Sequence, residues 1–183
     1  YNENRKISVK EIGPYLTESN IIVGRTSKPL FNLPKMIGGD FARDGNHLFF
    51  ENSEKKSICS QYPEAKNFFK RCVGGNDFLK GIKRWCLWID ESEYTNAKRI
   101  QPIKNVLDKV SSFRAESSRE GTQKYADKPY RFTEIKYQQG QKFFIPTTTS
   151  EHRDYLPIGV YDSEYVIIAP HQVIYEPPLF LFS

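Results

Sequence analysis

The chain has 183 residues, of which 38% are hydrophobic and 27% are charged, and it carries a net charge of +5. This length fits one domain with its own hydrophobic core. No apolar run reaches the roughly 18 residues of a membrane helix, and the start lacks a signal-peptide pattern, so the sequence argues against a membrane or secreted protein. We therefore expect a soluble, cytoplasmic protein.

The first half of the chain alternates short apolar runs with turn signals. A strand is predicted at residues 21–23, and Asp44-Gly45-Asn46 predicts a tight turn before a strand at residues 47–51, with Gly45 supplying a positive φ. Pro63 suits the start of a helix that runs to about residue 71. Alternation over residues 81–89 predicts a strand in which Trp85 and Trp88 belong to the core rather than to a stacking surface.

The second half begins with the clearest helix of the sequence. Residues 101–117 carry an apolar stripe with helical spacing, and Pro102 marks the first turn. Further strands are predicted at residues 142–145, 155–160, 165–169 and 173–175. A strand-rich C-terminal part with helices in the middle indicates an α+β fold, a single mixed domain over residues 1–183 in which residues 1–6 form a tail. The chain starts at Tyr1 and ends on an apolar run, so we expect a fragment of a larger chain.

Basic residues are concentrated in one segment. Residues 98–142 contain eleven Lys or Arg residues against five acids, a local excess larger than that of the whole chain. Such a segment attracts phosphate backbones, although a charge run can equally form a solvated face. The candidates for phosphate contact are Lys104, Lys109, Arg114, Lys128 and Arg131.

Residues 143–159 combine two apolar arms with a polar centre. Between the arms, residues 147–154 are eight consecutive side chains that can donate or accept hydrogen bonds. This pattern indicates a loop that presents polar groups to a ligand, and the alternative is an ordinary solvated loop between two strands.

Metal-dependent chemistry has weak candidates only. Glu134-Ile-Lys136 has the Glu-x-Lys form of a metal-dependent nuclease, which Asp108 or Asp127 would complete. Asp90, Glu91 and Glu93 could bind a metal, or start a helical turn. Glu176-Pro-Pro-Leu179 departs too far from a methyltransferase base-gripping loop, and no glycine-rich cofactor loop occurs, so no cofactor or metal is predicted in this chain. The three cysteines, Cys59, Cys72 and Cys86, are expected to be free buried thiols.

Several ordered motifs together resemble one family. They are Arg25-Thr-Ser-Lys-Pro-Leu30, Pro34-Lys-Met36-Ile-Gly38, Asp44-Gly45-Asn46-His47-Leu48, Gly81-Ile-Lys-Arg-Trp-Cys-Leu-Trp-Ile89 and Ser150-Glu151-His-Arg153-Asp-Tyr155-Leu-Pro-Ile-Gly159. This order resembles the target-recognition domain of MmeI-like (Type IIL) bifunctional restriction-modification enzymes, which are also DNA adenine-N6 methyltransferases. The chain departs from the family in the block Thr147-Thr148-Thr149, where an Arg is common after the proline, and in the extended end Tyr175-Glu-Pro-Pro178.

The resemblance implies a domain that is not itself an enzyme. Its partners would be double-stranded DNA and the methyltransferase and nuclease domains of the parent chain, which would hold S-adenosylmethionine and Mg²⁺. The polar loop would read bases through Ser150, Glu151, Arg153 and Asp154, since Arg pairs well with guanine and acids accept from cytosine. On an extended segment, Glu151 and Arg153 would project the same way. The open alternatives are a self-contained nuclease using Glu134 and Lys136, and a protein-interaction domain.

Overall fold

The computed structural model describes residues 8–13, 16–20, 24 and 33–182, and the chain divides into two compact units, residues 1–33 and 34–183. In the first unit, Ile12 and Glu18 pair as an isolated antiparallel bridge. Every helix and strand that the structure describes belongs to the second unit. The strand predicted at residues 21–23 and the tail at residues 1–6 lie outside the described residues.

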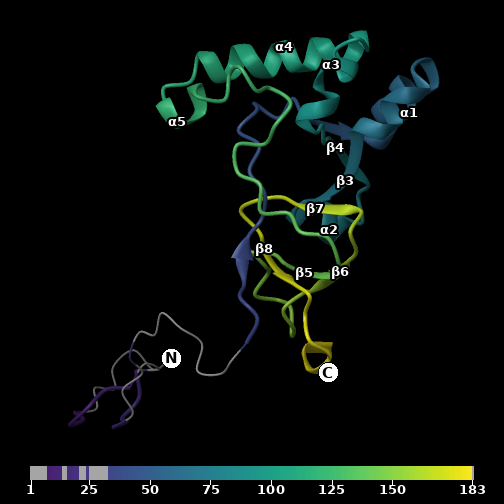
Figure 1. Ribbon diagram of the computed structural model, residues 1–183. Coiled ribbons are helices and arrows are strands. Elements are labelled where there is room, and N and C mark those ends of the chain that lie inside the picture. Colours follow the sequence, from purple (N-terminus) through teal and green to yellow (C-terminus); the bar gives the residue numbers. More distant parts are fainter. Residues whose placement is uncertain (1–7, 14–15, 21–23, 25–32, 183) are drawn as a thin grey trace. The chain divides into compact units, whose positions relative to one another are not determined.

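One four-stranded sheet of the second unit has the order β2-β4-β3-β7 (Figure 1). Its strands are β2 (Phe49–Glu51), β4 (Arg84–Leu87), β3 (Phe69–Val73) and β7 (Tyr165–Ile167). β4 pairs antiparallel with β2 and with β3, whereas β7 comes from the C-terminal part of the chain and pairs parallel with β3. The sheet therefore joins segments that are far apart in the sequence.

The helix predicted from Pro63 to residue 71 is wrong in its second half. Only a 3₁₀ helix, η1 (Pro63–Phe68), forms there, and the chain then enters β3. β3 is a central strand with partners on both sides, so two ladders of backbone hydrogen bonds outweigh the local helix signal that Pro63 starts.

The second sheet is antiparallel throughout and has the order β1-β8-β5-β6. Its strands are β1 (Ile37–Gly38), β8 (Gln172–Tyr175), β5 (Lys142–Ile145) and β6 (Gly159–Tyr161). The strands predicted at residues 142–145, 165–169 and 173–175 are confirmed as β5, β7 and β8 with small changes in length. The predicted strand at residues 155–160 is shorter, because residues 155–158 have no ladder partner and Pro157 has no N–H to donate.

The helices gather in the middle of the sequence, as predicted for the α+β class. They are α1 (Asn52–Gln61), α2 (Gly75–Lys80), α3 (Tyr94–Ala97), α4 (Gln101–Ala115) and α5 (Glu120–Gln123), with the 3₁₀ helices η2 (Glu91–Glu93) and η3 (Leu179–Phe182). Within the second unit, α4 and α5 lie at the end opposite to the β1-β8-β5-β6 sheet (Figure 1). Asp90 precedes η2, and Glu91 and Glu93 lie within it. Of the two hypotheses for these acids, metal binding and the start of a helical turn, the structure shows the helical turn.

Two buried clusters hold the second unit together. The larger one packs Ile103, Leu107 and Val110 of α4 against Leu48 and Leu87. The smaller one joins the two sheets through Val73, Phe144, Ile167 and Val173. The thiols of Cys72 and Cys86 are buried and form no disulfide, as predicted, while Cys59 is only half-buried.

The turn before β2 forms as predicted. Gly45 has φ +66°, a conformation that a side chain would strain. The buried carboxylate of Asp44 accepts hydrogen bonds from the backbone N–H groups of Asn46 (3.2 Å) and Leu48 (2.6 Å). This turn delivers β2 to the edge of its sheet.

Candidate nucleic-acid interface

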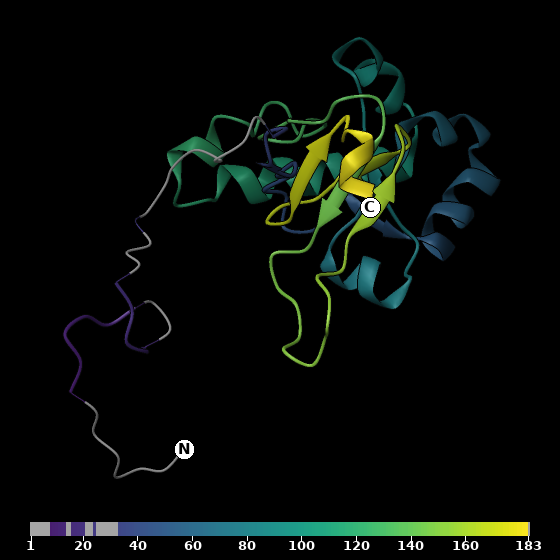
Figure 2. The ribbon, with the colours of Figure 1, turned by 90° about the horizontal axis from the view of Figure 1, so that it is seen from below.

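The β5–β6 loop, residues 146–158, carries the polar centre that the sequence singles out. β5 and β6 pair antiparallel through Lys142–Tyr161, Phe143–Val160 and Phe144–Gly159, so the loop connects two neighbouring strands. Figure 2 shows it as a light-green loop that projects from the second unit. The four predicted base-reading residues, Ser150, Glu151, Arg153 and Asp154, all have exposed side chains.

The tip of the loop is a turn rather than the extended segment expected for Glu151 and Arg153. The backbone N–H of Arg153 donates to the carbonyl of Ser150 (3.2 Å), and the Ser150 Oγ accepts from the N–H of His152 (3.2 Å). The predicted same-side projection of Glu151 and Arg153, which depends on extended backbone, therefore does not apply. Both side chains instead occupy one turn at the end of the loop.

The charged groups of the tip remain largely free. Among the described residues, no carboxylate lies within 4.0 Å of the Arg153 guanidinium, and Glu151 Oε1 lies 3.9 Å from His152 Nε2. The salt bridge from Arg153 to Glu151 or Asp154, which would have fixed the loop internally, is thus not formed. The guanidinium and both carboxylates are available to an external ligand.

His171 anchors the start of the β5–β6 loop. Its Nε2 accepts a hydrogen bond from the N–H of Gly75 in α2 (2.7 Å), and its Nδ1 lies 3.4 Å from the Thr147 hydroxyl. The backbone N–H of Thr147 also points at Nδ1 (3.3 Å), so both ring nitrogens of His171 face backbone donors. Burial lowers the pKa of His171, with a smaller opposing effect from Asp77. No local sequence pattern marks this histidine, and its contact partner Thr147 belongs to one of the two segments in which the chain departs from the family resemblance.

The prediction that Arg114 contacts phosphate is wrong. Its side chain has 0% exposure, and all five guanidinium N–H donors are used within the protein. The acceptors are the backbone carbonyls of Arg43, Tyr125, Lys128, Ala42 and Arg131, at 2.8 to 3.1 Å. Burial lowers the pKa of Arg114, and the charge of Asp44 opposes that effect. Arg114 is therefore a structural tie between α4 and two loops, and it is not available to a phosphate.

The helical spacing shows why Arg114 is buried. The buried residues of α4 are Ile103, Leu107, Val110 and Arg114, which follow one stripe, whereas Phe113 is 42% exposed. The choice of Arg114 as a phosphate contact requires its side chain on the outer face of α4, and the structure places it on the buried stripe instead. Lys104, Lys109 and Arg131 are exposed and Lys128 is half-buried, so these four keep their place as candidates for phosphate contact.

Glu134 and Lys136 are engaged with other charged groups. Glu134 Oε1 lies 3.3 Å from Arg43 Nη2, and its Oε2 lies 3.6 Å from Lys136 Nζ. Within the described ranges, no three His, Cys, Asp or Glu residues are grouped so that they could hold a metal ion. No described helix is long and apolar enough to cross a bilayer. The geometry gives no support to Glu134 and Lys136 as a nuclease centre.

The fold and the exposed loop define a recognition module, and comparison with known proteins gives its family. The model of the MmeI target recognition domain matches residues 17–183. DNA methyltransferase A of Bacillus subtilis (strain 168) is 32% identical over all 183 residues, which correspond to 21% of that protein. A solved structure of the Type IIL restriction-modification enzyme MmeI in complex with DNA is similar at 29% identity with a TM-score of 0.85, over 96% of this chain and 24% of the other.

The chain belongs to the MmeI target recognition domain family. Membership and the α+β fold are both confirmed, and the domain is not itself catalytic. The chain spans between a fifth and a quarter of the length of the two relatives.

Proposed function

We propose that this domain reads a specific sequence in double-stranded DNA for the methyltransferase and nuclease domains of a larger, cytoplasmic restriction-modification enzyme. The exposed turn at the tip of the β5–β6 loop carries the proposal, because its charged groups are not consumed by contacts within the protein. The similarity to a restriction-modification enzyme solved with DNA and to a bacterial DNA methyltransferase supports the same partner and context.

The loop tip has the chemistry of direct base readout. Arg153 can hold guanine by two hydrogen bonds, and Glu151 or Asp154 can accept from the amino group of cytosine, each contact discriminating by about 1–3 kcal/mol. Ser150 adds a hydroxyl that can donate or accept. A loop that projects from the body of the domain can enter a groove while its strands stay in the sheet.

Phosphate contacts would come from the basic segment. Lys104 and Lys109 are exposed on α4, and Lys128 and Arg131 lie in the loop whose carbonyls Arg114 holds. Such contacts fix the register of the protein on the duplex without carrying sequence information. They would let the β5–β6 loop meet the bases in one orientation.

The methyl donor and the nuclease metal belong to other domains in this proposal. S-adenosylmethionine and Mg²⁺ would be held by the parent chain, and this domain would supply neither site. Isothermal calorimetry of the domain with S-adenosylmethionine should show no heat of binding. Micromolar binding would contradict the assignment.

The decisive experiment exchanges the charges at the loop tip in the full-length enzyme. Glu151→Lys combined with Arg153→Asp should change the base accepted at one position of the methylated sequence while methylation activity survives. Sequencing of methylated adenine sites in genomic DNA gives the readout. A matched control is Glu120→Lys with Lys124→Asp, which exchanges the charges of two exposed residues in and just after α5. If the methylated sequence stays the same and activity falls at every site, Glu151 and Arg153 have a structural role.

A further inference from the structure

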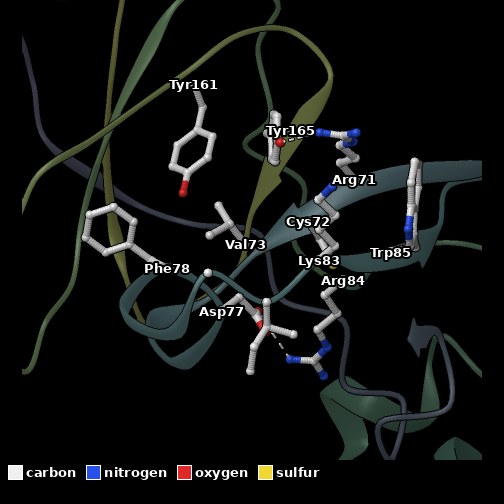
Figure 3. A pocket seen from close by; sticks show the side chains of 12 residues that line it. Arg71, Cys72, Val73, Asp77, Phe78, Lys83, Arg84, Trp85, Tyr161 and Tyr165 are labelled. Carbon is white, nitrogen blue, oxygen red and sulfur yellow. Dashed lines mark hydrogen bonds and ion pairs between the residues drawn. The ribbon is translucent and has the colours of Figure 1, made fainter. Parts of the chain in front are cut away.

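A second basic surface lies around Trp85, outside the segment that the sequence marks as basic. Two neighbouring cavities of about 200 and 380 Å³ both include Arg71 and Trp85 in their linings. Figure 3 shows the smaller one, with Arg71, Lys83, Trp85 and Tyr165 around it. The basic side chains that line the two cavities are Lys55, Lys66, Lys70, Arg71, Lys83 and Arg84. Lys70 and Arg84 alternate with Arg71 and Trp85 along β3 and β4, so their side chains lie on the other side of the sheet, where Lys70 contacts Tyr137 and Arg84 contacts Asp77. We call the remaining basic residues, Lys55, Lys66, Arg71 and Lys83, together with Trp85, the Trp85 face.

Strand pairing assembles the centre of the Trp85 face. Arg71 on β3 is in register with Trp85 on β4 and with Tyr165 on β7, so the three side chains lie on one side of the sheet. Arg71 Nη1 donates to the Tyr165 hydroxyl (2.6 Å), which orients the guanidinium. Trp85 Nε1 donates to Asn52 Oδ1 of α1 (3.2 Å), which fixes the indole. The face is therefore built on rigid elements.

The charges of this surface are not neutralised by nearby acids. The two cavities are lined by six basic side chains but only two acidic ones, Asp77 and Glu164. Asp77 pairs with Arg84 at 3.6 Å. Among the described residues, none of Lys55, Lys66, Lys70, Arg71 and Lys83 has a carboxylate within 4.0 Å. A group of close cations without counter-charges favours an anionic partner.

The position of Lys55 decides which part of a nucleic acid fits. Its Nζ lies 3.7 Å from the centroid of the Trp85 ring, and the Arg71 guanidinium carbon lies 5.4 Å from it. Two cations thus lie close to the indole ring. An unstacked base needs a free aromatic face to stack on, so this site favours the backbone of a nucleic acid over its bases. Arg71 uses Nη1 for Tyr165, and its other donors have no acceptor among the described residues. A planar guanidinium fork with free donors matches a phosphate.

We propose that the Trp85 face binds the sugar-phosphate backbone of double-stranded DNA, as a second phosphate-contact surface separate from the one on α4. This inference rests on the proposed function, since it takes DNA as the partner. It adds contacts to a segment of the duplex that the β5–β6 loop does not read, and it contributes affinity without sequence preference.

The test measures how binding of the full-length enzyme to duplex DNA of arbitrary sequence depends on salt. The variant Lys55→Gln, Lys66→Gln, Lys83→Gln removes three charges and leaves Arg71 and Trp85 in place. Each lost phosphate contact lowers the slope of log K against log salt by about 0.9, so the slope should fall by about 2 to 3. The matched control is Lys10→Gln, Lys35→Gln, Lys56→Gln, three exposed lysines outside the face whose replacement should leave the slope unchanged.

Three results would overturn the inference. If the wild-type enzyme binds no duplex at any salt concentration, the proposed function fails and the inference fails with it. If the wild type binds and the triple variant keeps the wild-type slope, the inference alone fails. If the triple variant keeps the DNA slope but loses binding to poly-glutamate, the Trp85 face is a docking site for an acidic protein segment instead.

Discussion

The basic segment 98–142 and the Trp85 face are both rich in cations, but only the first is visible in the sequence. In the segment, charges adjacent in sequence are divided by the fold, because Arg114 is buried while Lys104 and Lys109 are exposed. In the Trp85 face, Lys55, Arg71 and Lys83 come from separate parts of the chain, and strand pairing and α1 bring them together. Local charge density therefore overestimates the first surface and misses the second.

The difference has a physical origin in how each cation is satisfied. Arg114 is surrounded by backbone carbonyls and serves folding, whereas Arg71 has one acceptor, the Tyr165 hydroxyl, among the described residues. A cation whose donors are all used inside the protein has none left for a ligand. Four measurements test this distinction.

The largest effect is expected for Arg114→Met. This change leaves five carbonyls without their donor and removes the tie between α4 and two loops, which should destabilise the domain by about 3–5 kcal/mol. Arg114→Lys should rescue only part of the loss, since an ammonium has three donors and no planar fork. Urea unfolding measures the change, and Lys109→Gln, at an exposed position of the same helix, should lie within about 0.5 kcal/mol of wild type. An unchanged stability of Arg114→Met would return Arg114 to the ligand-binding set.

The second prediction concerns the exposed cations of the basic segment. Lys104→Gln with Lys109→Gln should lower the salt slope of DNA binding by about two, and across a fourfold rise in salt that corresponds to roughly a tenfold difference in affinity. Unfolding should be unaffected. Combining these changes with the Trp85-face triple variant should add the two slope reductions, because the surfaces share no residue. A combined reduction no larger than that of one set alone would mean that a single surface carries all of the phosphate contacts.

The third prediction separates the role of Trp85 from that of an ordinary core residue. Trp85→Leu removes the ring that holds Lys55, so affinity for duplex DNA should fall about two- to fivefold, consistent with a cation–π contact of about 0.5–1 kcal/mol. Trp88→Leu is the matched control, because Trp88 packs on Phe132 and Tyr137 with centroid distances of 5.3 Å in both cases. The control should lose stability and keep its DNA affinity per folded molecule. Equal affinity losses in both variants would indicate a common folding effect.

The sequence predicts well what periodicity and turn chemistry determine locally. The helix α4 and the strands β5 and β8 are correctly placed, because their patterns agree with their burial. β3 was missed because its identity depends on partners contributed by β4 and by the distant β7. Arg114 could have been found, since it continues the helical stripe of Leu107 and Val110. The anchor at His171 could not, because Gly75 and Thr147 are far from it in the sequence and only the fold brings them together.

The smallest effect is expected for the pH dependence of the His171 contact. This contact stabilises the β5–β6 loop and involves no residue of the two basic surfaces. Burial lowers the pKa of His171 below its ordinary value of about 6.5. The neutral ring is therefore the form favoured by folding, and its contribution is present above about pH 6.5 and lost as the pH falls through the lowered pKa. Protonation would place an N–H at Nε2 against the N–H of Gly75, so the hydrogen bond between them would break. Asp77 and Arg84 line the same cleft and form an ion pair at 3.6 Å.

The measurement is the difference in unfolding free energy between wild type and His171→Gln over the pH range 5 to 8. The difference should be constant above pH 7 at about 0.5–1.5 kcal/mol, the net value of one hydrogen bond, and should shrink as the pH falls below 6.5. Taking the difference cancels the titration of groups common to both proteins. Asp77→Asn is the companion variant, because removal of the carboxylate should lower the pKa of folded His171 further, so that the shrinkage still begins near pH 6.5 but becomes larger and extends to lower pH. A difference that stays constant down to pH 5 would show that His171 does not hold the loop through its neutral ring, and the base of the β5–β6 loop would then depend on sheet pairing alone.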